Sequence, residues 1–314
     1  MVTSDRPVRR ALILSGGGGR GAYQVGVWRR LQEVGWQPDL VCGTSIGSVN
    51  GALICSGLDA DRMQALWVSL DGKGIFNVSL WRRVKYRVNK LLGRHPDWPA
   101  LMDSEPLRRT LSEAVDEQRI RQGEPRLVVA ATNVCRGIVE YFTGAELSVQ
   151  HIVASCSIPI VFPWCEIGGE LYWDGGILSN TPVFPAIEAG ACEILVVLLS
   201  PAGGQVTEPP KTTREGIARM FDMLTLGSAQ SLNQSLSYHL GSDLRANADT
   251  LSREHCMDMG DIRVGLVAPR GESSIATVMD LDPKHVTERI TAGYNDAREQ
   301  LDKFLTPDKY SNQL

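Results

Sequence analysis

The chain has 314 residues, of which 43% are hydrophobic, and its formal net charge is −4 at pH 7. This length is enough for one large α/β domain or two small ones. The near balance of charge gives no support to nucleic acid as a bulk partner, and no apolar run reaches the roughly 18 residues that a membrane span needs.

The cysteines and the first ten residues indicate the compartment. The seven cysteines are an odd number at irregular spacing, without a C-x-x-C pair, which argues for reduced thiols and against a structural zinc site. No signal-peptide pattern precedes the first apolar run. We therefore expect a cytoplasmic protein, peripheral to membranes if it contacts them.

The first predicted element is a buried strand over residues 11–14, which runs into Ser-Gly-Gly-Gly-Gly-Arg-Gly at 15–21. A helical pattern follows and stops at Gly35. A glycine-rich turn at a helix N-terminus presents backbone N–H groups without obstruction, and the helix dipole adds positive potential. The turn therefore predicts an anion site, for a phosphate or for the oxyanion that forms when a serine attacks an ester.

The same glycines satisfy the dinucleotide pattern G-x-G-x-x-G, which requires an acidic residue at the end of the next strand. Asp39 has about the right spacing but precedes the strand 40–42. A Walker loop would need Gly-Lys followed by Ser or Thr, where this chain has Arg20-Gly21. A tight turn without a ligand is the other alternative, although four consecutive glycines are conformationally costly.

The next motif is Gly43-Thr44-Ser45-Ile46-Gly47, which reads G-x-S-x-G. A serine on a sharp strand-to-helix turn has its hydroxyl exposed toward substrate, and the glycines let the strand and helix approach each other. The apolar run 40–42 and the helix-compatible run 46–54 provide that context. Ser45 is thus a candidate nucleophile.

After a predicted helix at 59–70 and a turn at 71–74, residues 79–94 carry six basic side chains and no acidic one. Trp81 and four aliphatic residues fall on one helical stripe of this segment. A basic amphipathic helix can lie on an anionic membrane surface. The alternative is a solvated basic face above an ordinary core stripe.

The downstream elements complete an α/β pattern. Strands are predicted at 126–131, 171–173, 193–199 and 262–267, with 138–142 as a hairpin or sheet neighbour of the first of these. The segment 202–213 is a candidate mobile loop. The Met-rich run 220–226 is expected to be either a core stripe or an acyl-contact surface. A helix with one apolar face is predicted over 286–304. Helices that alternate with apolar strands predict a mostly parallel sheet covered on both faces, with ligands at the carboxyl ends of the strands.

A base for Ser45 is not apparent among the five histidines, whereas Asp174 precedes the turn Gly175-Gly176. The glycine loop, the G-x-S-x-G elbow and Asp-Gly-Gly occur in the order found in patatin-like phospholipases, which this chain resembles. Residues 154–163 and Asn180-Thr181-Pro182 look similar to that family as well. Ser15 departs from it, since many members have Asp there. The resemblance covers residues 8–200 and more loosely the C-terminal third.

The resemblance implies one domain over 8–306 in a three-layer α/β/α fold, with the core motifs within 8–200 and further strand and helical elements at 212–306. It implies a serine acyl hydrolase for lipid esters, with Ser45 as nucleophile and Asp174 as base, and with no cofactor and no metal. The implied oxyanion loop is Gly16, Gly17, Gly18 and Gly19, and the supporting motif residues are Arg20, Gly21, Gly43, Gly47, Gly175 and Gly176. Arg20 either stabilises the loop, contacts a lipid phosphate or is solvated. An esterase or thioesterase for other acyl groups, and a silent lipid- or nucleotide-binding module, are the alternatives.

Overall fold

The computed structural model describes residues 8–70, 100–201, 209–212, 256–259, 262–270 and 280–305, and the single positions 88, 216, 219, 223 and 227. The predicted turn at 71–74 lies outside the described residues. The same holds for the basic segment 79–94 except Val88, for most of the predicted loop 202–213, and for the Met-rich run 220–226 except Met223.

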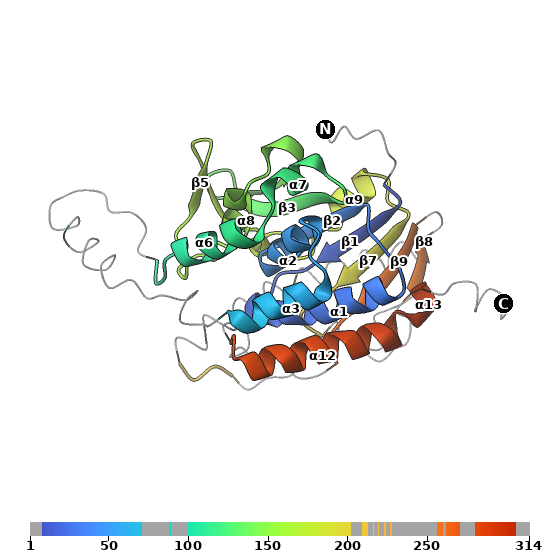
Figure 1. Ribbon diagram of the computed structural model, residues 1–314. Coiled ribbons are helices and arrows are strands. Elements are labelled where there is room, and N and C mark those ends of the chain that lie inside the picture. Colours follow the sequence, from blue (N-terminus) through green and yellow to red (C-terminus); the bar gives the residue numbers. More distant parts are fainter. Residues whose placement is uncertain are drawn as a thin grey trace.

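The described strands form one mixed sheet of nine strands in the order β5-β6-β3-β2-β1-β7-β9-β8, with β4 also paired to β3 (Figure 1). The five central strands are parallel, namely β3 (Arg126–Asn133), β2 (Leu40–Thr44), β1 (Arg10–Leu14), β7 (Glu193–Val197) and β9 (Ile262–Val267). The other four pair in antiparallel fashion at the two sides, namely β4 (Ile138–Thr143), β5 (Cys165–Ile167), β6 (Glu170–Asp174) and β8 (Cys256–Met259).

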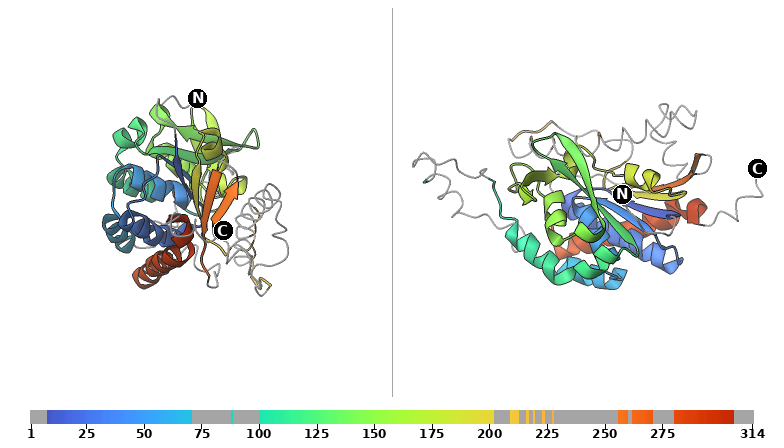
Figure 2. Two further views of the ribbon diagram at one scale, coloured as in Figure 1. Left: turned by 90° about the vertical axis from the view of Figure 1, so that its right-hand side faces the viewer. Right: turned by 90° about the horizontal axis from the view of Figure 1, so that it is seen from above.

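Helices cover the two faces of the sheet unequally in the described part of the chain (Figure 2). One face carries α1 (Ala22–Glu33), α2 (Ile46–Cys55), α3 (Ala60–Ser69), α6 (Glu105–Ala114), α7 (Glu117–Gln122), α8 (Val149–Ser155), α12 (Pro283–Gln300) and α13 (Asp302–Leu305). The short helix α9 (Phe184–Glu188) packs on the other face. The expected α/β fold with helices on both faces is confirmed. No helix among the described residues is both long and apolar enough to cross a membrane.

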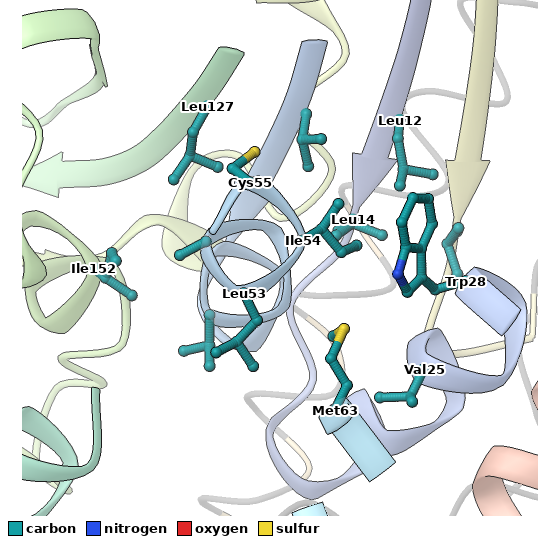
Figure 3. Close-up of a cluster of buried hydrophobic side chains, with 14 of the residues drawn as sticks. Leu12, Leu14, Val25, Trp28, Leu53, Ile54, Cys55, Met63, Leu127 and Ile152 are labelled. Atoms are coloured by element: carbon teal, nitrogen blue, oxygen red, sulfur yellow. The ribbon is translucent and has the colours of Figure 1, made fainter. Parts of the chain in front are cut away.

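The helix α2 lies in the middle of the larger core (Figure 3). Leu53 and Ile54 of α2 lie among side chains of β1, β3, α1 and α8, including Leu12, Leu127 and Ile152. Each large aliphatic side chain removed from water contributes about 1.5–3 kcal/mol. The residue that precedes α2, Ser45, is therefore attached to one of the most thoroughly packed elements of the molecule.

The helices α1 and α12 approach each other at backbone distance. A Cβ atom on Gly26 of α1 would lie 1.9 Å from the carbonyl oxygen of Ile290, and one on Gly293 of α12 would lie 2.0 Å from that of Tyr23. The Tyr23 hydroxyl also donates to the Asp296 carboxylate at 2.9 Å. Glycine at both positions is what allows this close packing of the first and the last long helix.

Candidate active site

Ser45 lies on a strained turn between β2 and α2. Its φ is 54° and its ψ is −127°, a backbone conformation that is rare for a residue other than glycine. A Cβ on Gly47 would lie 2.1 Å from the Leu14 carbonyl oxygen, and one on Gly43 would lie 2.4 Å from that of Gly47. Both glycines of the motif are therefore required by close backbone approach.

Buried serines hold this turn in place. The Ser45 N–H donates to the Ser155 hydroxyl at 2.8 Å, and that hydroxyl donates to the Ala130 carbonyl of β3 at 2.7 Å. The Ser48 hydroxyl donates to the Ser45 carbonyl at 2.6 Å. Strain at Ser45 is thus balanced by hydrogen bonds to β3 and α8. Sequence reasoning noted Ser155 only as part of a family-like stretch and gave Ser48 no role.

Asp174 ends β6 beside Ser45 and is 5% exposed. Its N–H donates to the Ser157 carbonyl at 2.9 Å, and its carboxylate accepts the Gly176 N–H at 2.7 Å. Burial raises the pKa of Asp174 to about 7, although hydrogen bonds from the Ser45 side chain and from Gly176 to its carboxylate act in the opposite direction. A carboxylate with a pKa near neutrality is a much better match for general-base catalysis than an exposed one.

The glycine loop follows β1 and borders Ser45, because a Cβ on Gly16 would lie 3.0 Å from the Ser45 Cβ. The Gly16 N–H is already used, since it donates to the Asn180 carbonyl at 3.2 Å. The Gly16 carbonyl accepts from Asn180 Nδ2 at 3.4 Å, and the Gly17 carbonyl accepts from Arg20 Nε at 3.2 Å. In a trans peptide the N–H points opposite to the C=O. The N–H groups of Gly17 and Gly18 therefore point away from these donors, which makes them the best candidates for an oxyanion hole.

Arg20 is 6% exposed and lies behind the loop. Besides the Gly17 carbonyl, it contacts the Ser200 hydroxyl at 3.1 Å through Nη1. The alternative that Arg20 is a solvated side chain is therefore wrong, and its contacts make it a support for the loop.

A buried polar network secures both ends of the loop. Gln24 Nε2 donates to the Ser15 carbonyl at 2.8 Å, and Asn50 Nδ2 donates to the Gly21 carbonyl at 2.9 Å and to Gln24 Oε1 at 2.8 Å. Trp67 Nε1 completes the network by donating to Asn50 Oδ1 at 3.0 Å. Sequence reasoning missed these residues, and the available signal was that Gln24 and Asn50 interrupt otherwise apolar helix faces.

The positions of Asp39 and of the histidines bear on the dinucleotide, histidine-base and metal-site alternatives. Asp39 precedes β2, at the end of the sheet opposite to the glycine loop, and its carboxylate accepts the N–H groups of Arg9 and Arg10 at 3.0 and 2.8 Å. It is therefore not placed to hold a ribose. Within the described residues, His151 contacts Ser148, His285 contacts Asp280, and no group of three or more His, Cys, Asp or Glu side chains could hold a metal ion.

Comparison with known proteins gives a consistent set of similarities. The family model of patatin-like phospholipases matches residues 12–187. A cGAMP-activated phospholipase from Pseudomonas aeruginosa (strain BWHPSA011 / Pa011) is 31% identical over 193 residues, covering 56% of this chain and 55% of the relative. Lysophospholipase NTE1 from Yarrowia lipolytica is 28% identical over 189 residues, covering 59% of this chain and 12% of the relative.

Among solved structures, human GIVD cytosolic phospholipase A2 in complex with methyl γ-linolenyl fluorophosphonate has a TM-score of 0.50 at 11% identity, covering 98% of this chain and 59% of the other. This likeness concerns the fold. The chain spans about half the length of the first curated relatives, at 55%.

Proposed function

Because this chain belongs to the patatin-like phospholipase family, we propose that it is a serine acyl hydrolase that cleaves carboxylic esters of lipids, of the phospholipase A or lysophospholipase type. The observation that carries the proposal is the pair formed by Ser45 and the buried Asp174, whose pKa of about 7 suits a base at neutral pH. Ser45 serves as nucleophile and Asp174 as its base, without a histidine.

In the first half of the proposed reaction, the Ser45 hydroxyl attacks the acyl carbonyl and its proton passes to the Asp174 carboxylate. The oxyanion that forms accepts hydrogen bonds from the Gly17 and Gly18 N–H groups, and each such donor is typically worth about 3–4 kcal/mol in the transition state. Asp174 then gives the proton to the leaving alcohol, which leaves an acyl group on Ser45.

In the second half, Asp174 accepts a proton from water as the water attacks the acyl-enzyme. The same loop stabilises the second oxyanion, and the proton returns to Ser45 as the fatty acid departs. A Ser45–Asp174 pair is chemically sufficient for both halves because each half needs one proton acceptor and one oxyanion site.

The proposal is tested with a fluorophosphonate probe and a soluble short-chain ester. The probe is expected to label Ser45, and Ser45→Ala and Asp174→Asn are each expected to abolish hydrolysis, with non-additive losses in the double variant. Ser69→Ala and Glu113→Gln, which replace exposed side chains on α3 and α6, serve as matched controls. Near-normal turnover by Asp174→Asn would contradict the role of Asp174, and absence of labelling in the wild type would favour a binding module.

The acyl class is tested by comparing a phospholipid, a lysophospholipid and an acyl thioester at equal concentration. Faster turnover of the two lipids supports the lipid assignment, whereas preference for the thioester supports the alternative. Since one relative is named for activation by cGAMP, the lipid assay is run with and without that nucleotide. Faster turnover with the nucleotide would extend the relative's regulation to this chain.

A further inference from the structure

The helix α12 reaches the glycine loop through one side chain. Arg289 Nη1 donates to the Gly19 carbonyl at 3.3 Å and to the Asp280 carbonyl at 2.7 Å, while Nη2 contacts the Asp280 carboxylate. The Arg289 side chain is only 16% exposed. α12 lies outside residues 12–187, the range that the family model covers.

The position of Arg289 is fixed relative to the loop. Its neighbour Ile290 presents the carbonyl that Gly26 of α1 approaches, and α1 begins at the residue after the loop. Asp280 holds the guanidinium through two acceptors, so the planar fork has a defined orientation. Arg289 therefore presents a donor to Gly19 from a rigid support.

The contact passes to the oxyanion donors through one peptide unit. The Gly19 carbonyl and the Arg20 N–H belong to the same planar peptide, so Arg289 and Gly17 hold its two ends. The Arg20 N–H donates to the Gly17 carbonyl at 3.3 Å, alongside Arg20 Nε at 3.2 Å. Because the Gly17 carbonyl and the Gly18 N–H belong to one planar peptide, this chain of contacts sets the direction of the Gly18 N–H.

We infer that Arg289 is a positioning residue for the oxyanion loop: it clamps the Gly19–Arg20 peptide and thereby aims the Gly18 N–H at the site beside Ser45. The inference rests on the proposed function and deepens it, since it makes the C-terminal helix part of the hydrolytic apparatus. Arg289 does not touch the reacting atoms in this assignment.

The test compares Arg289→Ala and Arg289→Lys with Arg298→Ala, which removes an exposed arginine from the same helix. Two properties are measured on each protein, namely hydrolysis of a soluble short-chain ester and amide hydrogen exchange in the peptide that contains residues 15–21. Arg289→Ala is expected to lower kcat about ten- to hundredfold with little change in KM, because the oxyanion exists only in the transition state. Exchange in the loop peptide is expected to be faster than in Arg298→Ala.

The outcomes separate the two proposals. Equal kcat per folded molecule, or equal loop exchange, in Arg289→Ala and Arg298→Ala overturns the positioning role. If Arg289→Ala does not fold, Arg289→Lys decides, since lysine keeps the charge but cannot bridge Asp280 and Gly19 as a fork. A wild-type protein without hydrolysis refutes the proposed function, and the exchange measurement then still decides whether Arg289 orders the loop.

Discussion

Replacement of Asp174 by Asn is expected to make the fold more stable at alkaline pH, although it removes the proposed catalytic base. The pKa of Asp174 in the folded state is about 7 because of burial, whereas an aspartate in an unfolded chain titrates near 3.9. A raised carboxyl pKa favours the folded state below the unfolded pKa, and this contribution is lost as pH rises through the folded pKa.

The size of the effect follows from the shift. A difference of about three pKa units at about 1.4 kcal/mol per unit corresponds to about 4 kcal/mol between acidic pH and about pH 8. The asparagine side chain would carry no charge at either pH, so Asp174→Asn should be more stable than the wild type by an amount that falls by about 2–3 kcal/mol between about pH 8 and about pH 5.

Urea unfolding of both proteins at the two pH values measures this difference, and all other titrating groups cancel in the comparison. Glu113→Gln, which replaces an exposed carboxylate on α6, is the control for removal of a carboxylate outside the site. The kcat/KM of the wild type should rise with pH through about 7, because the base must be ionised. A stability difference between Asp174→Asn and wild type that does not change with pH would refute the reasoning.

Three further predictions concern metal chelation, the basic segment 79–94 and the second glycine of the G-x-S-x-G motif. Exhaustive chelation should leave hydrolysis of a soluble ester unchanged, because backbone N–H groups supply the electrophile, and a loss restored by one specific cation would contradict this. Replacing Arg82, Arg83, Lys85 and Arg87 of the segment 79–94 by glutamine should weaken binding to anionic vesicles and slow hydrolysis of bilayer phospholipid, because each basic residue near the membrane surface contributes about 1 kcal/mol. Hydrolysis of a soluble ester should be unchanged, and equal losses on both substrates would mean that the segment is structural. Gly47→Ala should destabilise the fold severely, because its Cβ would lie 2.1 Å from a backbone oxygen. The control is Gly51→Ala on the same helix, whose Cβ would meet side-chain methyls at 3.1 Å. In thermal unfolding, Gly47→Ala should have the lower Tm of the two variants.

Local patterns predicted the central part of the fold well. The strands β1, β2, β3, β7 and β9 are short apolar runs, and the alternation of such runs with helices predicted a mostly parallel sheet but not its strand order. The hairpin partner at 138–142 is confirmed as β4, antiparallel to β3. The edge strands β5 and β8 were missed, because they are short and their pairing with β6 and β9 depends on contacts that no local pattern reveals.

In the candidate site, too, residues with a local sequence signal were predicted, whereas residues that are placed by contacts between distant segments were not. A serine between glycines and an aspartate before Gly-Gly are local signals, so Ser45 and Asp174 were predicted as site candidates, and the structure places them side by side. The N–H donors within the glycine loop were predicted only as a group of four. Distinguishing Gly17 and Gly18 requires the acceptors and donors of Asn180 and Arg20, and Asn180 is far away in sequence. The contact of Arg289 with the loop could not be predicted from the sequence for the same reason, since the packing of α12 on α1 is what brings Arg289 to the loop.

The close approach of Gly26 and Gly293 joins two helices that are far apart in the sequence. During synthesis the glycine loop, α1 and Ser45 are made before α12. Contacts between segments distant in sequence form late in folding, because a long loop of chain must close first. The glycine loop and Ser45 therefore exist in the growing chain before α12 supplies the side chain that contacts Gly19.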